Sequence, residues 1–164
     1  MHKRVLSKSA CRPRRLPGRR AEEEGDIVVH TASATVLLGL IAWTLCLLIL
    51  MEALRTGYIL RRKVIANEFR PDNSNLSPFM QRLARAHANC VESLPVFGTL
   101  LIVALIGNRT AVTDTLAPWL LAARVIQSCV HLASISVPAV NVRFMAFAVQ
   151  VAIAVYWLWA LLLG

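Results

Sequence analysis

The sequence predicts an all-α integral membrane protein, a bundle of four transmembrane helices that forms a single domain. The chain has 164 residues, of which 57% are hydrophobic, and its mean hydropathy is +0.58. The apolar residues gather in long blocks, and a block of about 20 residues is enough to cross a bilayer as a helix. Basic residues cluster at the ends of these blocks, as is typical of helices anchored at a membrane surface.

The formal net charge of +9 does not indicate a nucleic-acid-binding protein. No aromatic platform is interleaved with the basic residues, so we expect the lipid bilayer as partner and no nucleic acid. The cysteines show neither metal-ligand nor disulfide spacing, and we therefore expect no metal and interpret them as small apolar side chains. They are Cys11, Cys46, Cys90 and Cys129.

Residues 1–26 differ in composition from the rest of the chain. They are basic and then acidic, cannot form a packed core, and are predicted to be disordered. The apolar block that follows has full spanning length, which favours a retained helix over a cleaved signal peptide. We assign residues 27–164 to the membrane domain, and a translation start near Ile27 to Val29 would remove the tail altogether.

The first two helices are predicted on either side of a basic connection. The first covers residues 31–51 and continues to about residue 62; turn-forming residues then occupy 67–77. Ser77 is the expected N-cap of a second helix over residues 78–107. Pro95 lies inside that helix and predicts a kink.

The second half of the chain predicts two more helices. A turn over residues 108–114 leads to a helix from Leu116 to about Val137, which we expect Pro138 to end. The fourth helix is expected over residues 144–163. Positive-inside reasoning places loops 1 and 3 in the cytoplasm and both termini outside, whereas a translated basic tail favours the opposite orientation.

A polar stripe begins the second helix. Arg82, Arg85, Asn89 and Glu92 follow at spacings of three, four and three, which places them on one helical face. The apolar run after Glu92 is too short to span a bilayer alone, so the membrane must include Glu92. An ionisable group at that depth is costly, and we interpret it as part of a functional site.

The third helix carries a second stripe, which admits two interpretations. Arg124, Gln127, Ser128 and His131 share one face. In the first interpretation, Glu92 and Arg124 form a structural ion pair that sets helix register. In the second, the stripes line a pocket for a ligand with several carboxylates and one ammonium, because arginine binds carboxylates in a bidentate fork. His131 either lines that pocket or only forms a hydrogen bond with a neighbouring polar group. The donors available to such a ligand are Arg82, Arg85, Asn89, Gln127, His131 and Arg143.

The octapeptide Arg85-Ala-His-Ala-Asn89-Cys-Val-Glu92 resembles the R-x-x-x-N-x-x-E signature of the MAPEG superfamily, the membrane-associated proteins in eicosanoid and glutathione metabolism. The resemblance extends over about residues 30–164 and includes the helical plan, the Arg124 position and Pro138. It implies a homotrimer that binds glutathione as co-substrate between adjacent subunits. Such a protein would transfer glutathione to lipophilic electrophiles or would use it to reduce them.

The resemblance also implies roles for individual residues. Arg85, Asn89 and Glu92 would contact glutathione, Arg61 or Arg62 would reach in from the neighbouring subunit, and Gln127 and His131 would line the site. Members of the family place an arginine or tyrosine near the thiol. Here the likeliest tyrosine position holds Phe144, so Arg143 is the catalytic candidate that would stabilise the thiolate.

Two other function classes fit parts of the pattern. A non-catalytic membrane scaffold or interaction protein is consistent with the missing tyrosine. A small four-helix transporter also needs one membrane glutamate, but the arginines around Glu92 would repel cationic substrates. We expect a multi-pass protein of the bacterial inner membrane, with the endoplasmic reticulum as the alternative.

Overall fold

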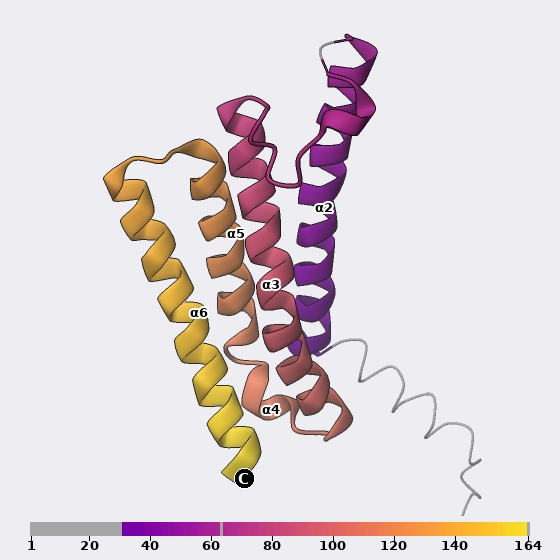
Figure 1. The fold of residues 1–164 in the computed structure, drawn as a ribbon. Helices are drawn as coiled ribbons and strands as arrows, with labels where there is room; N and C mark the ends of the chain where they lie inside the picture. The colour runs from indigo at the N-terminus through magenta and orange to yellow at the C-terminus, as the bar shows by residue number, and fades with distance from the viewer. Residues whose placement is uncertain (1–30, 63, 164) are drawn as a thin grey trace, which may run out of the picture.

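The computed structural model describes residues 31–62 and 64–163, and this part of the chain contains helices and no strands. Four long helices, one short helix and one 3-10 turn follow each other along the chain (Figure 1). In order they are α2 (Ala32–Leu60), η1 (Ala66–Glu68), α3 (Pro78–Ile106), α4 (Thr110–Thr113), α5 (Ala117–Ala133) and α6 (Val137–Leu163).

The long helices form an elongated bundle with two distinct ends (Figure 1). α2 lies beside α3, and α5 lies between α3 and α6. The α2–α3 connection and the α5–α6 turn lie at one end, which we call the loop end. The short helix α4 and the C-terminus lie at the other, the α4 end.

Side-chain caps explain where α2 and α3 begin. The Thr31 hydroxyl accepts from the Ala34 amide at 3.3 Å, and the Ser77 hydroxyl accepts from the Met80 amide at 3.4 Å. Each satisfies an amide that has no partner inside the helix. Pro78 in the first turn of α3 lacks only an N–H that would be unpaired there. The expected second helix is confirmed to within one residue, and it continues through Pro95.

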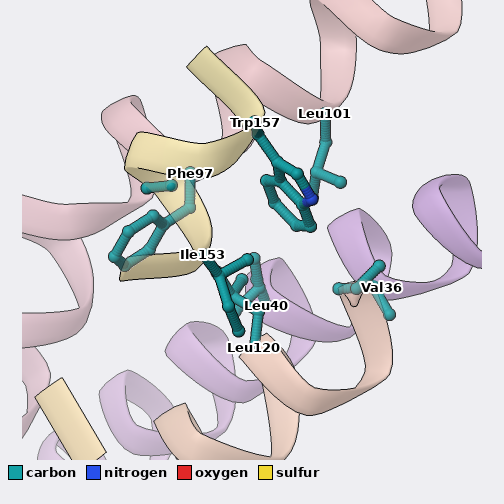
Figure 2. Close-up of a cluster of buried hydrophobic side chains, with 9 residues drawn as sticks. Val36, Leu40, Phe97, Leu101, Leu120, Ile153 and Trp157 are labelled. Atoms are coloured by element: carbon teal, nitrogen blue, oxygen red, sulfur yellow. The ribbon is translucent and has the colours of Figure 1, made fainter. Parts of the chain in front are cut away.

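The core near the α4 end draws on all four long helices (Figure 2). Trp157 of α6 and Leu120 of α5 are fully buried beside Leu101 of α3, and Leu40 of α2 packs against the same cluster. A second cluster joins α2 and α3 nearer the loop end, around Leu47, Met80 and Leu83 among others. These clusters hold the helices in register around the polar residues that lie between them.

The α4 end is closed by charged side chains that cap two helices. Asp114 accepts from the Ser33 amide at 2.9 Å and from its hydroxyl at 2.6 Å, at the start of α2. Arg109 donates to the carbonyls of Leu161 and Ala160, both at 2.8 Å, at the end of α6. An anion at a helix N-terminus and a cation at a C-terminus both stabilise the macrodipole.

The outer surfaces of the bundle are apolar. Leu38, Ile49, Ile102 and Val155, for example, are large hydrophobic residues with exposed side chains. Three helices, α2, α3 and α6, are long and apolar enough to cross a membrane by length and composition. α5 has 17 residues, about 25 Å at 1.5 Å per residue, so the fourth expected span is shorter than the other three. The chain is an integral membrane protein.

Several expected boundaries differ from the structure. α5 ends at Ala133, not near Val137, and α6 begins at Val137, seven residues before the expected start. Pro138 therefore lies in the first turn of α6, where a missing N–H costs little. The expected turn over 108–114 contains the short helix α4. The expectations for residues 1–26 lie outside the described residues.

Candidate functional site

A cavity of about 540 Å³ lies between α3, α5 and α6. Its volume is within the range of about 300–1,000 Å³ that is typical of small-molecule sites. We call it the central cavity. It is lined by Asn89, Glu92, Ser93, Val96, Phe97, Arg124, Gln127, His131, Val140, Arg143, Phe144 and Phe147. Six of these are polar residues from the two stripes or from the start of α6, so the fold brings the predicted stripes together.

Arg124 is the most deeply buried charge of the cavity, with 3% of its surface exposed. Its Nη1 donates to the Gln127 side-chain oxygen at 3.2 Å and to the Asn89 carbonyl at 3.4 Å. The guanidinium lies over the Phe97 ring, 5.4 Å from the centroid. Its Nε and Nη2 are buried without a hydrogen-bond partner. The buried guanidinium therefore has donors that no described residue of the chain satisfies.

The expected ion pair between Glu92 and Arg124 is not formed in the structure. Both residues line the central cavity, yet within the described ranges the ion pair closer than 4.0 Å joins Arg55 and Glu52. The physical reason is the placement of Arg124, which stacks on Phe97 and donates toward α5 and the α3 backbone, whereas Glu92 has an exposed side chain.

Gln150 of α6 belongs to this polar network, although the sequence interpretation assigned it no role. It is fully buried, and its side-chain nitrogen donates to the Gln127 oxygen at 3.0 Å and to the Ala146 carbonyl at 2.8 Å. The signal in the sequence was a lone amide in the otherwise apolar run over residues 144–163. Such a residue in a membrane helix normally needs a polar partner on another helix.

A second cavity of about 300 Å³ adjoins the first at the loop end of the bundle. We call it the basic cavity. It is lined by Pro78, Gln81, Arg82, Arg85, His131, Ile135 and Arg143. His131 and Arg143 line both cavities, whereas Arg85 lines the basic cavity and not the central cavity.

Arg61 and Arg62 line neither cavity. Both are exposed at the end of α2, and Arg62 has a positive φ of 53°. A residue with such a backbone directs the chain sharply away from the helix. Their side chains are therefore exposed, and they line neither the central cavity nor the basic cavity.

The apolar wall of the central cavity contains no tyrosine. Phe97, Phe144 and Phe147 provide its aromatic surface. The two tyrosines of the chain, Tyr58 on α2 and Tyr156 on α6, line neither cavity. Two arginines that line the cavity beside these rings, Arg124 and Arg143, are able to stabilise an anion.

The arrangement suits a polar ligand with an attached or neighbouring apolar group. The lining offers guanidinium, amide and imidazole groups together with one carboxylate, and it also offers phenylalanine and valine side chains.

Comparison with known proteins identifies the family. The MAPEG family model matches residues 33–163, which includes both polar stripes and all of the helices α3 to α6. No match was found among curated proteins or among solved structures. Since the family match covers most of the 164 residues, the chain belongs to the MAPEG family.

Proposed function

We propose that this protein binds glutathione in the central cavity and presents its thiol to lipophilic electrophiles dissolved in the membrane. The observation that carries the proposal is the convergence of Asn89, Glu92, Gln127, His131 and Arg143 on one cavity. Glutathione carries two carboxylates, one ammonium and one thiol, and the cavity offers both cationic groups and one carboxylate to bind such a ligand.

The polar groups suggest an orientation for the tripeptide. Glu92 is the carboxylate of the central cavity and would accept the ammonium, while Asn89 and Gln127 would bind amide groups. Arg85 and His131 would hold one carboxylate where the two cavities meet. Arg61 or Arg62 of an adjacent subunit would reach the other carboxylate, so the complete site would require an oligomer, which we propose to be a trimer.

Arg143 is the proposed catalytic residue. A free thiol has a pKa of about 8.5, and the thiolate is the reactive form. A guanidinium beside the sulfur favours the thiolate electrostatically. Arg143 lines the central cavity next to Phe144 and Phe147, where an apolar electrophile would meet the thiol. The reaction would be a glutathione transferase or peroxidase reaction in a multi-pass protein of a bacterial inner membrane.

The test is the thermal stability of the purified protein in detergent with glutathione and with S-hexylglutathione. Saturable stabilisation of the wild type is expected, because a ligand that binds only the folded state raises its stability by mass action. Asn89→Ala should need roughly tenfold more ligand, since one hydrogen bond to a charged or amide group contributes about 1–1.5 kcal/mol.

Asn141→Ala is the matched control, because Asn141 is an exposed asparagine of α6 that lines neither cavity. Its titration should equal that of the wild type. Absence of stabilisation in the wild type would reject glutathione binding. If glutathione binds but its thiol shows no thiolate absorbance, either in the wild type or in Arg143→Ala, catalysis would be rejected. That result would favour the non-catalytic scaffold, which the lack of a tyrosine in the cavity supports.

A further inference from the structure

The basic cavity concentrates positive charge without a compensating carboxylate. Arg82, Arg85 and Arg143 line it together with His131, and all three guanidinium groups act electrostatically on that imidazole. No aspartate or glutamate is among the lining residues. Like charges gathered in one cavity raise its free energy, and a bound anion would lower it.

The guanidinium groups are also short of hydrogen-bond acceptors. In the described part of the chain, Arg85 and Arg143 make no hydrogen bond and no ion pair, and Arg82 uses only its Nε, which donates to the Leu132 carbonyl at 2.9 Å. The terminal amines of all three side chains therefore remain free to donate. Glutathione, as proposed above, would engage Arg85 and Arg143 but leave the terminal amines of Arg82 without an acceptor.

Arg82 is held in place before any ligand arrives. Its hydrogen bond to Leu132 joins α3 to α5 across 50 residues, and its guanidinium lies over the Phe79 ring at 6.0 Å from the centroid. A side chain fixed in this way loses little conformational entropy when it binds an anion. The planar fork of an arginine matches the oxygens of a phosphate group in particular.

The position of the basic cavity corresponds to the level of the lipid headgroups. α3 has 29 residues, about 43 Å, whereas the hydrocarbon core of a bilayer is about 30 Å thick. Pro78, Gln81 and Arg82 belong to the first two turns of α3, before the apolar part of that helix. Ile135, at the rim, is 72% exposed and offers apolar surface to a lipid glycerol or acyl chain.

We propose that the basic cavity is a second site, overlapping the proposed glutathione site, that binds a phosphate group, namely the headgroup phosphate of an anionic phospholipid. Arg82 is its specific residue, and Arg85, Arg143 and His131 contribute to both sites. Basic pockets between membrane helices at headgroup depth are suited to such headgroups. Inorganic phosphate and soluble phosphate esters present the same oxygens and are the other source of this chemistry.

The experiment is thermal unfolding of the full chain in detergent, titrated separately with three additives. They are dioctanoylphosphatidylglycerol, the zwitterionic dioctanoylphosphatidylcholine and inorganic phosphate. We expect saturable stabilisation by phosphatidylglycerol and much weaker effects of the other two. Stabilisation by inorganic phosphate at equal concentration would support a phosphate site that a soluble ligand fills.

Two variants localise the effect. Arg82→Gln should raise the half-saturating concentration of phosphatidylglycerol about tenfold, as expected for one charge-assisted contact. Ile135→Glu should do the same by placing a carboxylate at the exposed rim, where it does not endanger folding, and Ile135→Gln is its neutral control. Arg70→Gln removes an exposed arginine outside the cavity and should leave the titration unchanged.

Glutathione titrations of the same proteins separate the two proposals. Arg82→Gln should keep the glutathione response, and Asn89→Ala should need roughly tenfold more glutathione while keeping the phosphatidylglycerol response. The second site is rejected if phosphatidylglycerol does not stabilise the wild type, or if Ile135→Glu and Ile135→Gln behave alike. It is also rejected if Asn89→Ala loses both responses together, because the two cavities would then form a single glutathione site.

Discussion

Asn73 shows how one residue fixes the approach of the chain to the site. It is fully buried and has a positive φ of 54°. Its side-chain oxygen accepts from Arg55 Nε at 3.0 Å and Nη2 at 2.7 Å, and its nitrogen donates to the Met80 carbonyl at 3.1 Å. Asparagine is among the few residues that adopt this backbone readily. Asn73 thereby joins the end of α2 to the first turn of α3, just before Arg82 and Arg85.

Replacement of Asn73 should destabilise the fold through two separable effects. Asn73→Ala should lower the unfolding free energy by about 2–4 kcal/mol, because it removes hydrogen bonds to a charged group and strains the backbone. Glycine at position 73 adopts the positive φ without strain. Asn73→Gly should therefore lower the unfolding free energy by about 1 kcal/mol less than Asn73→Ala does. Thermal unfolding in detergent measures both.

Asn75→Ala is the control for these variants. Asn75 is exposed and makes one hydrogen bond, from its nitrogen to the Glu68 carbonyl at 2.9 Å. We expect it to cost less than about 1 kcal/mol. Equal melting temperatures for Asn73→Ala and Asn75→Ala would show that the buried asparagine does not hold the connection.

At the scale of elements, the contact between α5 and α6 depends on a polar network inside an apolar bundle. The Gln127 oxygen accepts from Arg124 Nη1 at 3.2 Å and from Gln150 Nε2 at 3.0 Å. One acceptor thus satisfies donors from both helices. Partly satisfied networks of this kind are sensitive to the loss of any member.

A double-mutant cycle tests this network in the absence of ligand. Gln127→Leu should destabilise the protein by about 2 kcal/mol, because buried donors of Arg124 and Gln150 lose their acceptor. Adding Gln150→Leu should recover about 1 kcal/mol, since one stranded donor is then removed. Strictly additive effects of the two substitutions would mean that the amides do not interact.

At the scale of the molecule, the proposed glutathione site needs residues from two subunits. Asn89 lines the central cavity, whereas Arg61 and Arg62 are exposed at the end of α2 and do not line it. Each variant alone, Asn89→Ala or the double variant Arg61→Ala with Arg62→Ala, should lose most glutathione-dependent stabilisation. In a closed ring of subunits, every site joins one face of one subunit to the other face of its neighbour.

Co-expression of these two variants provides the test. Random mixing in equal amounts should restore about one quarter of the sites, because half of the subunits supply Asn89 and half of their neighbours supply the arginines. Glutathione binding per subunit in the purified mixture measures this fraction, and the mass of the detergent-solubilised particle measures the ring size. No recovery in mixed rings would place all contacts in one subunit or reject the role of the arginines.

The sequence by itself determined the helical class, the extent of α3 and the two polar stripes. Their signals are local: apolar length, the Ser77-Pro78 start and the three- and four-residue spacings depend only on neighbouring residues. The octapeptide from Arg85 to Glu92 also indicated the MAPEG family, which the match over residues 33–163 confirmed. The boundary between α5 and α6 was misplaced, because a proline ends one helix or begins the next equally well.

Only the tertiary structure decided which polar groups meet. Arg143 and Asn89 lie far apart in the chain yet line one cavity. Arg124 packs on Phe97 and does not form the ion pair with Glu92 that the first interpretation predicted. Helical spacing states which side chains share a face, but not which face of another helix lies opposite or which acceptor lies within reach. That choice depends on how the apolar clusters around Trp157 and Leu83 pack, because they set the mutual rotation of the helices.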